Sequence, residues 1–209
     1  IAYVWSYSSS DLSTPLLVST FWAGQEGSFL FWAVCSAVLS LFLLSYTQKR
    51  DIETTVMPVF LAVQVLLVVL LIAKSPFKSI YDQFPGELGP GQLPHDGRGL
   101  NPLLQNFWMV IHPPVLFIGF AAMAVPFSFA VAALWRRDYH SWLSNTFPWV
   151  LFSGFALGAG LMLGAYWAYG VLGWGGYWAW DPVENSSLIP WLISMALLHT
   201  MLAQARTGN

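Results

Sequence analysis

Five apolar stretches, each close to the roughly 20 residues that a helix needs to cross a bilayer, constrain this chain more than any other feature. They cover residues 29–48, 55–73, 115–135, 147–169 and 188–205. Only 9% of the 209 residues are charged, and the mean hydropathy is +0.59. A typical soluble domain has about 25% charged residues. The sequence therefore predicts an all-α polytopic membrane protein, a transmembrane helical bundle with five spans.

The distribution of lysine and arginine predicts how these spans are oriented. Basic residues are dense only in the two short loops and after the last span: Lys49, Arg50, Arg136, Arg137 and Arg206. Short loops rich in lysine and arginine stay in the cytoplasm. We therefore predict the outer side for residues 1–28, 74–114 and 170–187. Within the loop 74–114, the density of glycine and proline excludes regular structure over residues 85–94. From residue 100 we expect a short helix along the outer surface.

Charge and cysteine content narrow the possible functions. The net charge is −2 and the sequence has no basic run, so we expect a chain surrounded by membrane lipid and no nucleic-acid partner. The single cysteine, Cys35, lies in an apolar stretch and cannot form an internal disulfide or a thiol-exchange pair. Because the sequence begins at Ile1 without a methionine, we expect a fragment or one piece of a split protein.

The most distinctive segment is a tryptophan-rich loop in which residues 174–185 read Trp-Gly-Gly-Tyr-Trp-Ala-Trp-Asp-Pro-Val-Glu-Asn. One interpretation is the aromatic belt found at the interfaces of membrane proteins. However, Trp174, Trp178 and Trp180 lie inside a glycine-rich connector, where glycine lets a flat ligand approach the backbone. Such an aromatic surface suits a large planar ligand with charged edges, such as haem. The residues alone leave both interpretations open.

The end of this loop carries the signals of a helix start. Asp181 is suited to the N-cap, Pro182 to the first helical position, and Glu184 to the acidic position of a capping box. An alternative interpretation is that these two carboxylates form an acid–base pair. Helix capping accounts better for their spacing, and we expect the last helix to begin near residue 182.

Two histidines are candidate iron ligands. His112 precedes Pro113 and Pro114, which we expect to begin a helix, and it lies on the same side as the tryptophan-rich loop. The alternative is an interfacial histidine bonded to a neighbour. His199 lies 17 residues after the proline of the last helix start, well inside the bilayer at roughly 1.5 Å per residue. Ionisable groups there indicate function, and the alternative is a neutral histidine bonded to a serine or threonine on another helix, such as Ser153. The other two histidines, His95 and His140, are expected to be solvated.

These residues resemble a known family. The tryptophan-rich loop is similar to the WWD signature of membrane proteins that handle haem, which include CcmC, CcmF and CcsA types. Residues 182–199, Asn101–Gln105 with His112-Pro113-Pro114, and Trp22–Ser28 look like CcmF, the haem-lyase subunit of cytochrome c maturation, or its paralogue in nitrite reductase assembly. The similarity covers nearly the whole chain, with three separated motifs in the right order. Tyr177 stands where the family usually has tryptophan.

The resemblance implies a cofactor and roles for particular residues. The cofactor is haem b, with His112 ligating the iron of haem presented at the loop and His199 ligating an embedded haem. The residues implied to contact the presented haem are Trp174, Tyr177, Trp178, Trp180 and Asp181. No residue is implied to be catalytic in its own right. The family takes two further histidines from its C-terminal half, which this sequence lacks.

The resemblance also implies an activity, partners and a location. The activity is covalent attachment of haem to CxxCH motifs of apocytochrome c, with this fragment alone inactive. The alternative is a haem transporter or transfer factor of the CcmC or CcsA type. The implied partners are a haem chaperone of the CcmE type, the thiol-handling subunits CcmH and CcmI, and apocytochrome c. The implied location is the bacterial inner membrane with the loop facing the periplasm, or the mitochondrial inner membrane for a split organellar protein.

Overall fold

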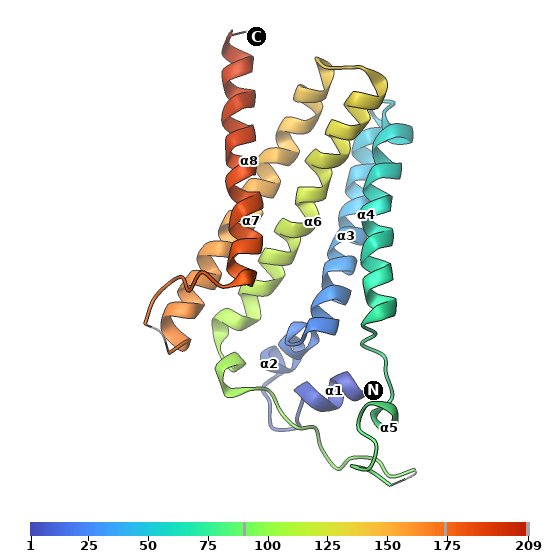
Figure 1. Cartoon of the computed structure of the whole chain (residues 1–209), viewed down its shortest axis with the longest axis vertical. Coiled ribbons are helices and arrows are strands. Elements are labelled where there is room, and N and C mark those ends of the chain that lie inside the picture. Colours follow the sequence, from blue (N-terminus) through green and yellow to red (C-terminus); the bar gives the residue numbers. More distant parts are fainter. Residues whose placement is uncertain (90, 174, 208–209) are drawn as a thin grey trace.

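The computed structural model describes residues 1–89, 91–173 and 175–207. Within these residues, five helices have the length and apolar composition needed to cross a membrane: α3 (Gln25–Gln48), α4 (Glu53–Ala73), α6 (Phe107–Arg136), α7 (Ser141–Val171) and α8 (Pro182–Thr207). They run alongside one another, with their connections gathered at the two ends of the bundle (Figure 1). The predicted all-helical class with five spans is confirmed. The closest pair is α6 and α7, with α3 and α4 packed on α6 and α8 packed on α7.

Glycines allow α6 and α7 to pack closely. A Cβ atom added at Gly119 of α6 would lie 2.6 Å from the Leu157 Cα of α7, and one added at Gly160 would lie 2.7 Å from the Leu116 Cα. Such distances are shorter than real side chains tolerate, so only glycine fits at both places. The spacing of Gly160 and Gly164 is the small-xxx-small pattern that brings membrane helices together. Residues near the N-terminal end of α6 are thereby held in register with α7.

The start of α6 differs from the sequence-based expectation. The helix begins at Phe107, capped by the Asn106 side chain, which accepts a hydrogen bond from the Trp108 backbone N–H at 2.9 Å. Pro113 and Pro114 lie inside the helix, so the expectation that they begin it is wrong. Pro113 has no N–H to bond the Met109 carbonyl one turn earlier. The indole Nε1 of Trp22 donates to that carbonyl at 3.2 Å instead, so a distant segment replaces the missing donor.

The end of the bundle that carries the N-terminus has short helices and turns as well as loop segments. They are α1 (Ala2–Tyr7), α2 (Thr14–Ser19), η1 (Thr20–Trp22), α5 (Ile80–Gln83) and η2 (Pro102–Leu104). The short helix expected after residue 100 corresponds to the 3-10 turn η2, and α6 begins shortly after it at Phe107. In Figure 1 the N-terminal helices and the long loop lie together at one end.

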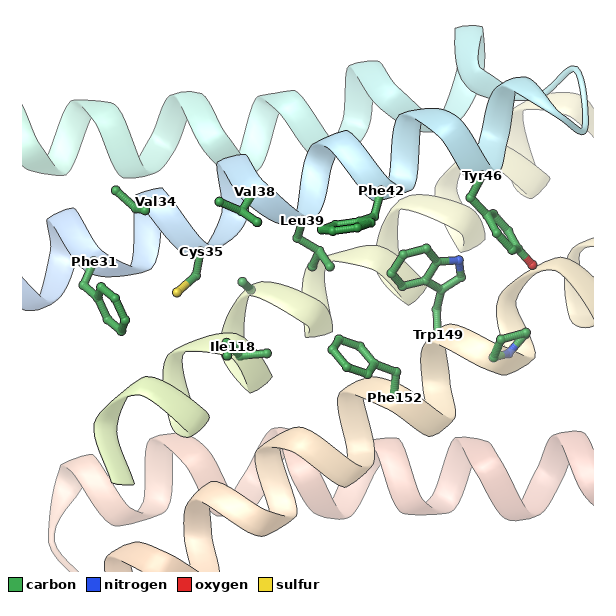
Figure 2. A pocket seen from close by; sticks show the side chains of 12 residues that line it. Phe31, Val34, Cys35, Val38, Leu39, Phe42, Tyr46, Ile118, Trp149 and Phe152 are labelled. Atoms are coloured by element: carbon green, nitrogen blue, oxygen red, sulfur yellow. The ribbon is translucent and has the colours of Figure 1, made fainter. Parts of the chain in front are cut away.

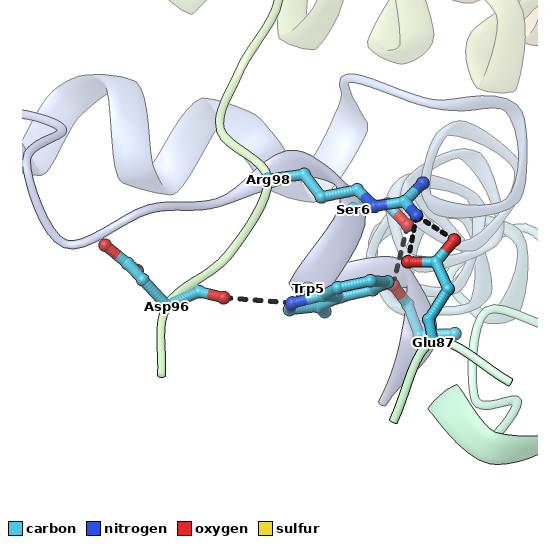
Figure 3. A network of polar contacts seen from close by, with 6 residues as sticks. Trp5, Ser6, Glu87, Asp96 and Arg98 are labelled. Atoms are coloured by element: carbon cyan, nitrogen blue, oxygen red, sulfur yellow. Dashed lines mark hydrogen bonds and ion pairs between the residues drawn. The ribbon is translucent and has the colours of Figure 1, made fainter. Parts of the chain in front are cut away.

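Arg98 fastens the long loop to the N-terminal segment (Figure 3). Its guanidinium lies over the rings of Trp5 and Phe84, at 4.4 and 4.6 Å from their centroids, and pairs with the Glu87 carboxylate. The Trp5 indole donates to the Asp96 carbonyl at 2.9 Å, and the Arg98 backbone N–H donates to the Trp5 carbonyl at 2.7 Å. The loop therefore has a defined path across the outer end.

Asp96 gives this attachment a dependence on pH. Its carboxylate accepts from the Ser10 hydroxyl at 2.6 Å and from the backbone N–H groups of Ser10 and Gly97 at 2.9 and 2.7 Å. These hydrogen bonds, foremost that of the Ser10 hydroxyl, hold the pKa of the carboxyl below its usual value. A carboxyl with a lowered folded-state pKa adds stability above its unfolded pKa of about 3.9, and this contribution is lost as the pH falls through the folded-state pKa.

We therefore expect hydrogen-exchange protection of the amides at residues 5–10 to fall as the pH is lowered from about 7 to about 3. The Asp96→Asn variant should show lower protection at neutral pH, and its protection should fall less than that of wild type as the pH is lowered. Asp82→Asn, which changes another exposed acid of the same outer segment, is the matched control. Equal pH profiles for wild type and Asp96→Asn would contradict the expectation.

Candidate functional site

His112 is held against α7 by a hydrogen bond that defines its protonation. Its ring nitrogen Nδ1 lies 2.8 Å from the carbonyl oxygen of Gly160. Because a carbonyl can only accept, Nδ1 carries the proton, and in the neutral ring Nε2 keeps a free lone pair. A histidine bonded through one nitrogen to a backbone carbonyl is the usual arrangement of a metal ligand. The imidazole is half-buried and lies parallel to the Trp167 ring, with 10° between their planes and 6.4 Å between centroids.

A small pocket brings His112 together with the tryptophan-rich loop. Its volume is about 110 Å³, and its walls come from α6, α7, the loop and the first turns of α8. His112, Trp178 and Asp181 all line it, so the structure brings three of the predicted site residues to one place. Sites that enclose a whole ligand measure about 300–1,000 Å³. This pocket can therefore take only one edge of a molecule as large as haem.

Polar atoms in the pocket wall are suited to a ligand with acceptor groups. The indole N–H groups of Trp167 and Trp178 are buried and have no hydrogen-bond partner among the described residues. A buried donor without a partner is costly, and both indoles belong to residues that line the pocket. Together with the free Nε2 of His112, these donors fit the iron and the carboxylate-bearing edge of haem.

The remaining aromatic residues of the loop are placed differently. Tyr177 stacks on Tyr169 with 4.2 Å between centroids, and Trp180 meets Trp178 edge to face at 6.3 Å. Both Tyr177 and Trp180 are exposed, at 54% and 71%, and neither lines the pocket. The predicted site residue Trp174 lies outside the described residues.

Asp181 and Glu184 form the reciprocal capping box expected from their spacing. The Glu184 N–H donates to Asp181 Oδ1 at 2.8 Å, and Glu184 Oε2 accepts from the N–H groups of Ala179 and Asp181 at 2.7 and 3.4 Å. The Asn185 amide also donates to the Trp180 carbonyl at 3.1 Å. The predicted helix start is confirmed, because α8 begins at Pro182. The acids thus hold the loop beside the pocket.

His199 lies on an exposed face of α8, and it does not line the His112 pocket. Its Nδ1 lies 2.7 Å from the Met195 carbonyl of its own helix. The Ser153 hydroxyl donates to the Val150 carbonyl of its own helix, so the structure does not support the alternative of a His199–Ser153 hydrogen bond. The Trp191 indole, which donates to the Gly154 carbonyl at 3.0 Å, attaches α8 to α7. The two candidate ligands therefore belong to separate places, one beside α7 and one facing away from the bundle.

A larger crevice lies between α3, α6 and α7 (Figure 2). It measures about 670 Å³, and its lining is apolar, with Cys35, Ile118 and Trp149 among the side chains that face it. The residues that line it, as far as the structure describes them, include no histidine. The small pocket at His112 is therefore the better candidate for iron.

Three residues of this site were not predicted from the sequence. Gly160, Gly164 and Trp167 contact His112 from α7. Their spacing of four and three residues places them on one helix face, which is the only signal the sequence offers.

Comparison with known proteins identifies the family. The family model for "Cytochrome C assembly protein" matches residues 22–208. This chain belongs to the cytochrome c assembly protein family. Over its whole length it is 37% identical to the cytochrome c-type biogenesis proteins NrfE of Haemophilus influenzae and CcmF of Pseudomonas aeruginosa.

A solved structure of Cytochrome c Heme Lyase CcmF agrees with this assignment. It matches 94% of the present family member with a TM-score of 0.70 at 33% identity. The resemblance to CcmF and its NrfE paralogue is therefore confirmed for the chain as a whole. The present chain spans 32% and 31% of the length of the NrfE and CcmF relatives, and 30% of the solved chain.

Proposed function

We propose that this chain is the part of a cytochrome c haem lyase that holds haem at the outer face of the membrane for attachment to apocytochrome c. The observation that carries the proposal is the His112 ring, whose Nδ1 is bonded to Gly160 and whose Nε2 is free beside the tryptophan-rich loop. A single imidazole suits haem iron, because the porphyrin already supplies the equatorial nitrogens and needs only axial ligands.

The residues of the chain bind and orient rather than react. His112 Nε2 would hold the haem iron, and a further ligand would have to come from outside this chain. Trp178 packs against the porphyrin edge, and the Asp181–Glu184 box keeps the loop in place. Haem, when bound, supplies the vinyl groups that receive the two thiols of a CxxCH segment. Correct placement of reactants accounts for a large part of such a rate increase.

The partners follow from what the chain itself lacks. Cys35, the one cysteine of the sequence, lies within a spanning helix, so thiol handling falls to subunits of the CcmH and CcmI type. Haem arrives on a chaperone of the CcmE type, and apocytochrome c is the acceptor. The location is the bacterial inner membrane, with the two short basic loops in the cytoplasm.

We also propose that His199 ligates a second haem b within the membrane. Its ring lies on an exposed face of α8. The other contacts to the porphyrin, and the opposite iron ligand, would therefore come from helices outside this chain. A haem held by His199 would supply one-electron transfer to the presented haem, giving up its own electron when the presented iron is reduced to the ferrous state.

The alternative function is haem transfer without bond formation, as in CcmC or CcsA types, since a tryptophan-rich loop and an outer histidine suit both. The test is to express the assembled membrane complex with a cytochrome c in cells that lack their own lyase. A lyase yields cytochrome whose haem survives denaturing electrophoresis and acid–acetone extraction. A transfer factor yields haem that is extracted, and that result would refute the proposal.

A further inference from the structure

One face of α7 surrounds the His112 ring. Residues 160, 164 and 167 are spaced by one turn each and so lie on the same side of the helix. Each has a different relation to the ring. The Gly160 carbonyl accepts its hydrogen bond, Gly164 has no side chain that would clash with it, and the Trp167 indole lies parallel to it.

Gly164 provides the space that the ring occupies. A Cβ atom at this position would lie 2.5 Å from His112 Cε1, 2.9 Å from Nδ1 and 3.1 Å from Nε2. Even a methyl group would therefore displace the edge of the ring that carries both nitrogens. Gly170 of the same helix differs, because a Cβ atom there would meet nothing within 4 Å.

Trp167 and the Gly160 carbonyl fix the remaining freedom of the ring. The carbonyl holds the proton on Nδ1, and the parallel indole limits rotation of the imidazole plane. Trp167 also lines the ligand pocket, where its buried N–H lacks a partner among the residues that the structure describes. Groups that orient a metal-ligating histidine commonly change metal affinity by about 10- to 100-fold when they are removed.

We propose that residues 160, 164 and 167 form a positioning face that sets the plane and the protonated nitrogen of His112 before iron binds, with Trp167 as a positioning residue. This inference rests on the proposed function, because it assumes that His112 ligates haem iron. It adds three residues of α7 to the site and assigns each a separate physical task.

The test uses rescue by free imidazole in the assembled complex. His112→Gly should lose the absorption of presented haem and regain it when imidazole is added, because the positioning face still shapes the space. In His112→Gly combined with Gly164→Ala, the missing ring leaves room for the methyl group, so the protein can fold. Rescue should then need at least about tenfold more imidazole. His112→Gly combined with Gly170→Ala is the matched control and should be rescued like the single variant.

Electron paramagnetic resonance of the ferric haem gives a second, independent readout. Trp167→Leu should shift the g values, which report the plane of the axial imidazole, and weaken haem binding about tenfold. Trp135→Phe, which changes a tryptophan that is 71% exposed at the other end of α6, should change neither. Equal rescue with Gly164→Ala and Gly170→Ala, together with unchanged g values in Trp167→Leu, would overturn the inference. Haem retained in His112→Gly without imidazole would instead refute the proposed function.

Discussion

The variant His112→Ala is expected to lower the yield of covalent cytochrome c by about 100-fold or more when the assembled complex is tested in cells. The imidazole is the only side chain of the described pocket that offers a neutral nitrogen to iron. Without it, haem at the loop loses an axial ligand, and its vinyl groups are no longer held in front of the incoming thiols. Haem staining of the cytochrome, normalised to the amount of complex by immunoblot, measures the effect.

The control for this variant is His95→Ala, which removes an exposed histidine on the same outer side. It should leave the yield within about twofold of wild type, since exposed side chains of this kind contribute little to stability. A yield for His112→Ala above about half of the control would mean that the imidazole does not hold the presented haem.

The variant His199→Ala is expected to abolish the b-type absorption of the embedded haem while leaving the protein in the membrane. When alanine replaces this membrane-embedded histidine, the iron keeps at most one axial ligand. Haem b is then lost on purification. The reduced-minus-oxidised spectrum of the purified complex measures this loss. His112→Ala should keep that spectrum, because the two histidines belong to separate places.

The matched control is His140→Ala, an exposed histidine in the turn between α6 and α7. If electrons pass from the embedded haem, cytochrome yield in His199→Ala should recover when a chemical reductant keeps the presented haem ferrous. An unchanged b-type spectrum in His199→Ala would rule out ligation. A lost spectrum with an unchanged cytochrome yield would rule out only the electron transfer.

Features that depend on neighbouring residues could be predicted from the sequence. The spans follow from apolar length, and the α8 start follows from the capping box of Asp181 and Glu184, whose partners lie three residues apart. The resemblance to the family rested on short motifs of the same local kind. His112 and the tryptophan-rich loop were expected on one side, and the structure places His112 and Trp178 in one pocket.

Features that depend on distant residues could not be predicted. Pro113 appeared to begin a helix because its replacement donor, Trp22, lies 87 residues from the carbonyl it bonds. The orientation of His112 depends on Gly160, 48 residues away, which no local pattern of α6 reveals.

The indole bond from Trp22 to Met109 has a practical consequence for anyone who shortens this protein. A version trimmed to begin at α3 would keep every spanning helix and both candidate iron ligands, so by hydropathy it would look intact. It would nevertheless leave the Met109 carbonyl oxygen, three residues before His112, without its hydrogen-bond donor. The segment before α3, through Trp22, therefore supports the backbone next to the candidate iron ligand without contributing a ligand of its own.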